Sequence, residues 1–309
     1  MDGVAPAVVV DHGPGLTART HVKGSLSTMT GTAALDGEHG REFFKLCGSG
    51  NDFVFFDARE RTAGILAEPE AIQRLCARAT GVGADGVVFL EPSSAGDVRM
   101  AYYNSDGSRA TLCGNATLCT TRLAVELGIV DPAGFVIETD AGPIRARIRD
   151  GRPEIEMPAV RELAGTAAGI APAAGEERIG FALAGVPHLV VRVADVEAVD
   201  LDGRGRVLRH DPTLSAGANV NFVSRTPSGD GWRMRTYERG VEGETLACGT
   251  GAVACAAVLA AWQDAGESAV ILTSSGRALE VRQPTRTGQG PTLAGEGRIV
   301  FRARLGDLG

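Results

Sequence analysis

The alternation of apolar and polar residues predicts that most of the chain after residue 43 consists of short β-strands. In residues 144–148, which read IRARI, every second side chain is apolar, a pattern typical of a strand with one buried face. Similar segments recur, separated by turn residues. The predicted strands are residues 53–56, 87–90, 98–103, 135–139, 144–148 and 155–157, followed by 188–193, 219–224, 232–237, 270–273, 279–282 and 299–305.

Three helices are predicted, and two of them share a local plan. In one, Cys113 precedes a helix over residues 117–127; in the other, Cys248 precedes a helix over residues 252–262. A glycine follows each cysteine, and a turn rich in glycine and acidic residues comes before it. The second helix is apolar nearly all round, so we expect protein to enclose it on every side. The third predicted helix covers residues 72–78.

The repeated plan suggests an internal duplication into two strand-rich halves. We expect residues 41–158 to form the first half and residues 159–297 the second, with the strand in 298–309 returning to the first half. Residues 159–185 are weakly patterned and mark the boundary region, and residues 1–40 are interpreted as a disordered leader. In a duplicated fold the two helix N-termini are expected to face each other across a cleft between the halves.

Composition excludes several classes of protein. The 309 residues carry a net charge of −7, and only 5% are aromatic, which argues against a nucleic-acid partner. No apolar run reaches the ~20 residues that span a bilayer, and no secretory signal is recognisable. The six cysteines include no CxxC pair. We therefore expect a cytoplasmic enzyme with reduced thiols and no membrane partner.

Cys113 and Cys248 are suited to proton transfer at the α-carbon of an amino acid. Without a cofactor, that reaction needs a base on one face, an acid on the other and donors around the carboxylate. Backbone N–H groups at a helix N-terminus are such donors. A thiol there is expected to have a lowered pKa, which makes it an effective base.

The other cysteines have simpler interpretations. Cys76, Cys119 and Cys255 are predicted to be small buried side chains. A disulfide or zinc role for Cys113 and Cys248 stays open, although no ligand spacing supports it.

A series of motifs then runs through nearly everything after residue 41. In order they are GSGNDF (48–53), GADG (83–86), NSDGS (104–108), CGN (113–115), PH (187–188), NVNF (219–222), YERG (237–240) and ETLACGTGA (244–252). In this register the chain resembles the diaminopimelate epimerase family. The resemblance implies an α/β fold of two pseudo-symmetric halves, each a curled sheet around a central helix, with the active site between them.

The resemblance also assigns roles to residues. It implies that Cys113 and Cys248 form a thiol/thiolate pair that works without cofactor or metal, and that Glu238 and His188 lie beside the reacting centre. The residues implied to hold the substrate are Gly114, Asn115, Gly249 and Thr250 through backbone donors, and Asn51, Asn104, Asn219 and Arg239 through side chains. A homodimer is compatible with this reading.

One departure from the family pattern bears on the substrate. Family members usually read Gly-Asn-Pro-His, whereas this chain has Val186 in place of the asparagine. Valine cannot donate a hydrogen bond, and a site built around a carboxylate is sensitive to losing a donor. Epimerisation of LL- to meso-diaminopimelate is the first hypothesis. A relative that acts on another amino acid is the alternative.

Two further hypotheses come from other classes. An isomerase of the same fold with carboxylate chemistry, of the phenazine type, is disfavoured by the paired cysteines. A non-catalytic binding protein would keep the cleft, and both cysteines would then be dispensable.

Overall fold

A computed structural model describes residues 36–285 and 289–306, so most of the predicted leader, residues 1–40, lies outside the described residues. The few leader residues that are described contain the short 3-10 helix η1 (Asp36–Glu38). Arg41 follows it, and its guanidinium donates hydrogen bonds to the carbonyl oxygens of Arg61 and Thr62. These contacts hold the segment against the fold.

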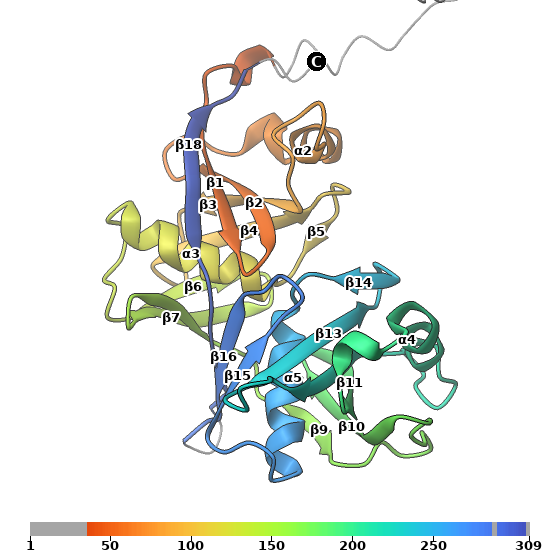
Figure 1. Cartoon of the computed structure of the whole chain (residues 1–309). Coiled ribbons are helices and arrows are strands. Elements are labelled where there is room, and N and C mark those ends of the chain that lie inside the picture. Colours follow the sequence, from red (N-terminus) through yellow and green to blue (C-terminus); the bar gives the residue numbers. More distant parts are fainter. Residues whose placement is uncertain (1–35, 286–288, 307–309) are drawn as a thin grey trace, which may run out of the picture.

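The first half of the molecule forms one series of strands around helix α3 (Figure 1). Strands β1 and β2 form a hairpin, β3 runs parallel to β2, and β4 returns antiparallel to β3. Strand β6 then runs parallel to β4, and β7 and β8 follow antiparallel. The elements are β1 (Glu42–Gly48), β2 (Asn51–Asp57), η2 (Gly64–Ala67), α2 (Pro69–Cys76), β3 (Gly86–Glu91), β4 (Val98–Asn104), β5 (Arg109–Ala110), α3 (Gly114–Glu126), β6 (Phe135–Thr139), β7 (Gly142–Arg149) and β8 (Arg152–Glu156).

The second half repeats this order of pairings around helix α5. Strands β10 and β11 form a hairpin, β12 runs parallel to β11, and β13 returns antiparallel. Strand β15 is parallel to β13, and β16 and β17 follow antiparallel. The elements are β9 (Arg161–Ala164), β10 (Glu176–Ala184), β11 (Val186–Val193), η3 (Val196–Ala198), α4 (Leu201–Arg209), β12 (Asn219–Arg225), β13 (Trp232–Glu238), β14 (Gly243–Thr245), α5 (Gly249–Ala261), β15 (Ser268–Leu272), β16 (Ala278–Arg282), β17 (Thr292–Ala294) and β18 (Arg298–Arg304).

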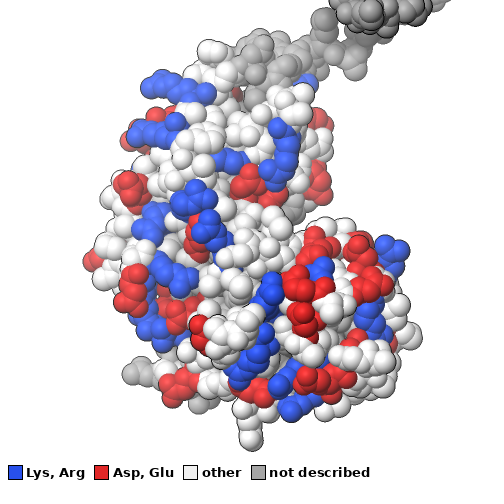
Figure 2. Space-filling view, viewed as in Figure 1, with Lys and Arg blue, Asp and Glu red and all other residues white. Residues whose placement is uncertain are grey.

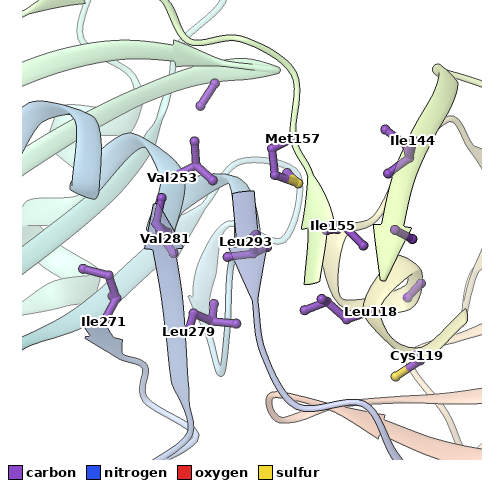
Figure 3. Packing of buried hydrophobic residues seen from close by; sticks show 14 of the residues in the cluster. Leu118, Cys119, Ile144, Ile155, Met157, Val253, Ile271, Leu279, Val281 and Leu293 are labelled. Atoms are coloured by element: carbon purple, nitrogen blue, oxygen red, sulfur yellow. The ribbon is translucent and has the colours of Figure 1, made fainter. Parts of the chain in front are cut away.

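Two strand pairs connect the halves. Strand β17 pairs with β8 of the first half, and β18 pairs with β1 along its whole length. Leu293 of β17 lies opposite Ile155 of β8, and Figure 3 shows both between Leu118 of α3 and Val253 of α5. The apolar cluster around the two helices is therefore continuous from one half to the other.

Each predicted strand overlaps an observed one, and the two helices that follow cysteines begin three residues earlier than predicted. No strand was predicted in the weakly patterned residues 159–185, but they contain β9 and β10. Gly180 explains why the pattern is hidden: a Cβ there would lie 2.5 Å from a methyl carbon of Val258 on α5. The strand lies so close to the helix that small residues replace the usual large apolar ones.

Helix α4 was also missed. Its sequence contains two glycines, which lower helix propensity by about 1 kcal/mol each. Gly205 is required by packing, since a Cβ there would lie 2.7 Å from Cβ of Tyr237.

The surface carries charges of both signs. Figure 2 shows Lys and Arg interspersed with Asp and Glu over both lobes, with a notch in the surface between them. Strands β5 and β14, which precede the two cysteines, lie on the two sides of this notch in the same view. Within residues 36–285 and 289–306, no helix is long and apolar enough to span a membrane.

Candidate active site

The two Cys-Gly turns meet at the centre of the molecule. Cys113 is the N-cap residue of α3 and Cys248 is the N-cap residue of α5, each with extended backbone. A Cβ built on Gly249 would lie 3.6 Å from Cα of Gly114. The first turns of two helices are thus in contact, and their free N–H groups and positive dipole ends converge on one place.

Each thiol lies beside the backbone amides of the helix that it begins, and the Cys248 thiol accepts a hydrogen bond from one of them. The Gly251 amide donates to Sγ of Cys248 over 3.3 Å, and Oγ1 of Thr250 lies 3.5 Å from the same sulfur. At Cys113 the side chain accepts no capping hydrogen bond, but the nearby backbone amides of Ala116 and Asn115 lower the pKa of its thiol. These contacts stabilise the thiolate form of either cysteine.

Burial outweighs these donors. Burial, together with the nearby carboxylate of Glu238, raises the pKa of Cys113 to about 11 and the pKa of Cys248 to about 12. The prediction of lowered thiol pKa values was therefore wrong, because it counted the helix N-termini and left out desolvation. A charge on Cys113 also raises the pKa of Cys248, so the two thiols titrate as a pair.

Glu238 is the last residue of β13 and lies near both thiols. Its Oε2 accepts a hydrogen bond of 2.6 Å from the hydroxyl of Thr245. Burial raises the pKa of this carboxyl, and the hydrogen bond opposes the shift. The site thus holds three groups, Cys113, Cys248 and Glu238, whose charges are mutually unfavourable.

His188 lies on β11 and is fully buried. Burial, together with the charge of Arg239, lowers the pKa of its imidazole to about 3. Its Nε2 has no hydrogen-bond partner in the part of the chain that the structure describes. The ring is therefore neutral and has one unused polar atom.

A chain of amides and carboxylates orients Asn115. Asp85 accepts a hydrogen bond of 3.0 Å from Nδ2 of Asn51, and Oδ1 of Asn51 accepts one of 2.7 Å from Nδ2 of Asn115. Oδ1 of Asn115 is left buried without a partner among the described residues, and lies 3.9 Å from where a Cβ of Gly249 would be. Arg78 donates to Asp85 and completes the chain. An acceptor is thus directed at the N-terminus of α5.

The remaining predicted residues lie at strand ends. Oδ1 of Asn219 accepts a hydrogen bond of 2.7 Å from the backbone amide of Arg239, whose Nη1 donates to the carbonyl oxygen of Ala216. Asn104 ends β4 and donates to Oγ of Ser108 in its own turn. Asn104 is thus held within its own turn, and among the described residues it is the predicted site residue least connected to the others.

Three residues near the site were not predicted. Asp85 orients Asn51, the amide of Asn221 contacts His188, and the hydroxyl of Tyr102 contacts the Cys113 thiol. Asp85 and Asn221 stand inside the motifs GADG and NVNF, so the motifs indicated them without a role. No sequence feature indicated Tyr102, because its position in the alternating pattern of β4 is that of an ordinary core residue.

The described residues also include possible ligands of a metal ion. Among residues 36–285 and 289–306, no three side chains of His, Cys, Asp or Glu are grouped so that they could hold a metal ion.

The sequence is similar to that of a known enzyme family along most of its length. A family model described as diaminopimelate epimerase matches residues 43–162 and 181–293. A diaminopimelate epimerase from Gemmatimonas aurantiaca is 50% identical over 278 residues, which cover 86% of this chain and 99% of that protein. A diaminopimelate epimerase from Aquifex aeolicus is 43% identical over 234 residues, covering 70% of this chain and 80% of that protein.

Solved structures share the fold at low sequence identity. A PhzF-family phenazine biosynthesis protein from Bacillus anthracis superimposes with a TM-score of 0.65 at 18% identity, covering 86% of this chain and 98% of that one. A hydroxyproline epimerase from Agrobacterium vitis gives a TM-score of 0.63 at 21% identity, covering 87% and 93%. At these identities the likeness concerns the fold alone.

Proposed function

The chain belongs to the diaminopimelate epimerase family, and on this premise we propose that Cys113 and Cys248 are the two bases of its reaction. The enzyme is an isomerase that interconverts LL- and meso-diaminopimelate, a step of lysine biosynthesis. The observation that supports the cysteine assignment is the contact between Gly114 and Gly249, which brings both cysteine-capped helix N-termini to one point.

The reaction moves one proton at each face of the α-carbon. The thiolate of one cysteine takes the α-proton, and the electron pair of the broken C–H bond is delocalised into the α-carboxylate. The thiol of the other cysteine then donates its proton to the opposite face, so that the two cysteines end with exchanged protonation states. Neither step requires an external oxidant, reductant or cofactor.

The backbone amides of Gly114, Asn115, Gly249 and Thr250 are proposed to stabilise the charge that develops on the carboxylate. They belong to two first helical turns, where N–H groups have no partner within the helix. The unpartnered Oδ1 of Asn115 is an acceptor suited to the α-ammonium group.

The side chains of Asn51, Asn104, Asn219 and Arg239 are proposed to recognise the polar ends of diaminopimelate. Arg239 can bind a carboxylate with two parallel hydrogen bonds. Glu238 and His188 are proposed to adjust the thiols and the substrate from beside the reacting centre. Because the relatives are named diaminopimelate epimerases at up to 50% identity, we interpret Val186 as a tolerated variation.

The decisive experiment measures exchange of the α-proton in deuterated water by NMR, with LL-diaminopimelate and a panel of single amino acids, without added cofactor. Exchange confined to diaminopimelate supports the proposal. Cys113→Ala and Cys248→Ala should each lower the epimerisation rate by about 10³-fold or more. Cys255→Ala, a matched change of a buried cysteine on α5, should retain activity. Full activity in either of the first two variants would refute the two-thiol assignment.

We further propose that the enzyme acts in the cytoplasm, without nucleic-acid or membrane partners. The net charge of −7 and the mixed charges in Figure 2 support this. A homodimer is the assembly that we would test first, by light scattering over a range of protein concentrations.

A further inference from the structure

The amide of Asn221 lies beside His188 inside the second half, and the reaction as described above leaves it without a role. Asn221 is the third residue of β12, and His188 lies on the neighbouring parallel strand β11. Both side chains are 0% exposed. In such a place hydrogen bonds decide how each group is oriented, because water does not compete for them.

The backbone carbonyl group of Leu189 determines which position of the Asn221 amide holds the nitrogen and which holds the oxygen. Nδ2 of Asn221 donates to the backbone carbonyl oxygen of Leu189 over 3.0 Å, and Oδ1 accepts from the hydroxyl of Thr236 over 2.9 Å. A hydroxyl can donate or accept, but a carbonyl oxygen can only accept. The nitrogen of the amide must therefore face Leu189.

That orientation determines the tautomer of His188. The same Nδ2 lies 3.1 Å from Nδ1 of the imidazole. Because an amide nitrogen can only donate, Nδ1 must be the acceptor, and a neutral imidazole then carries its proton on Nε2. The low pKa of His188, caused by burial and by Arg239, is consistent with a neutral ring.

The proton on Nε2 has no acceptor among the described residues. A buried donor without a partner is rare in folded proteins and indicates a group that is supplied from elsewhere. The ammonium groups of an amino acid can only donate, whereas its carboxylate oxygens can only accept. A carboxylate oxygen is therefore the chemical match for this donor.

The Asn221 amide also lies close to the first turn of α5. A Cβ on Gly251, in the first turn of α5, would lie only 2.5 Å from Oδ1 of Asn221. The amide thus occupies the space that a side chain at position 251 would fill, directly behind Cys248.

We propose that Asn221 is a positioning residue that holds His188 as the neutral Nε2–H tautomer, so that the ring donates a hydrogen bond to a carboxylate oxygen of the substrate. The identity of the acceptor rests on the proposed function. The assignment of the tautomer does not rest on the proposed function, because it follows from hydrogen bonds within the chain.

The tautomer is measured by long-range ¹H–¹⁵N correlation NMR on the full ¹⁵N-labelled chain, with the His188 signals identified by their loss in His188→Gln. The expected result is a protonated Nε2 and an unprotonated Nδ1. A proton on Nδ1 of the wild-type protein would overturn the proposal. The tautomer itself is measured on the wild-type protein, so the result does not depend on the activity of a variant.

Asn221→Asp tests the role of the amide. A carboxylate at this position accepts and does not donate, so Nδ1 of His188 should gain a proton and kcat/KM for diaminopimelate should fall by at least about tenfold. The matched control is Thr236→Val, which removes the contact to Oδ1 but leaves Leu189 to orient the amide. Its tautomer should be unchanged and its activity should stay within about threefold of wild type.

The outcomes separate this proposal from the preceding one. An unprotonated Nδ1 in Asn221→Asp, or a changed tautomer in Thr236→Val, would overturn the role of Asn221 even if both cysteines prove essential. Conversely, activity in Cys113→Ala would refute the two-thiol assignment and leave the tautomer measurement valid.

Discussion

The two halves repeat one order of strand pairings but surround their cysteines with different side chains. The register of the strands makes Phe53 of the first half equivalent to His188 of the second, because each lies opposite the first residue of the following parallel strand. By the same count, Tyr102 corresponds to Thr236. Ala116 and Gly251 are each the third residue after a cysteine.

In the first half these positions form an aromatic contact, and in the second they form a hydrogen-bonded chain. The rings of Phe53 and Tyr102 meet edge to face with centroids 6.0 Å apart, and the hydroxyl of Tyr102 contacts Cys113. In the second half Thr236, Asn221 and His188 are joined by hydrogen bonds. Duplication thus supplied two similar helix N-termini, while the side chains behind them make the two thiols chemically distinct.

Among changes that compare the two halves, the largest expected effect comes from replacing the small residue three positions after each cysteine. Gly251→Ala places a Cβ 2.5 Å from Oδ1 of Asn221 and 3.2 Å from Sγ of Cys248. We expect a loss of about 100-fold in kcat and of about 1–3 kcal/mol in the free energy of unfolding. Steady-state kinetics and urea denaturation measure the two quantities.

Ala116→Gly is the matched change in the first half. It adds no atoms, so kcat should stay nearly unchanged. Lower helix propensity and the loss of a buried methyl group should together cost about 1–2 kcal/mol of stability. Equal losses of activity in the two variants would show that the halves do not differ at this position.

The next effect concerns the reactivity of the thiols. Cys113 is partly exposed with a pKa of about 11, whereas Cys248 is buried with a pKa of about 12. Iodoacetamide should therefore modify Cys113 about tenfold faster or more, with both rates rising as pH rises, because only the thiolate reacts. Peptide mass spectrometry over a time course gives both rates, and modification of Cys248 first would contradict the assignment of environments.

A third effect is the dependence of stability on pH. The pKa of His188 is lowered to about 3 in the folded chain, from 6.5. Between these values the unfolded chain binds a proton that the folded chain does not, so stability falls as pH falls from about 6.5 to about 3. Urea denaturation should show a smaller fall in His188→Gln, by on the order of a few kcal/mol.

Position 53 is the control for this measurement, since Phe53 cannot titrate. Phe53→Leu should lower the free energy of unfolding by a similar amount at both ends of the pH range. A pH dependence unchanged by His188→Gln would mean that the imidazole is accessible to protons in the folded protein.

The smallest effect is expected at Tyr102. Its hydroxyl contact lowers the pKa of Cys113, so Tyr102→Phe should slow alkylation of Cys113 by a few-fold and leave Cys248 unaffected. A change at both cysteines would indicate a general disturbance of the core.

The sequence predicted the features that depend on local pattern. Alternation located the strands with large apolar residues, and the shared Cys-Gly plan identified the two helices and both cysteines. It missed β10, in which contact with α5 demands small residues, and α4, whose Gly205 is required by Tyr237. Both errors arise from tertiary packing, because a short stretch of sequence does not show which distant residues it will contact.

The site shows the same division. Motifs indicated Asn51, Asn115, Asn219 and Arg239 by type. Only the structure shows that both ends of the Asn51 amide are bonded, whereas Oδ1 of Asn115 has no partner among the described residues. The thiol pKa values were predicted in the wrong direction because desolvation depends on the whole surrounding core.

The pairing of β1 with β18 also affects how the chain folds during synthesis. These strands come from opposite ends of the described chain, so β1 keeps one edge unpaired until residues 298–304 have left the ribosome. At about 5–20 residues per second this interval lasts on the order of tens of seconds. Throughout it, Phe43 and Phe44 lie on an open strand edge, where another chain can add. Closure of this edge therefore waits until nearly all of the described chain has been made.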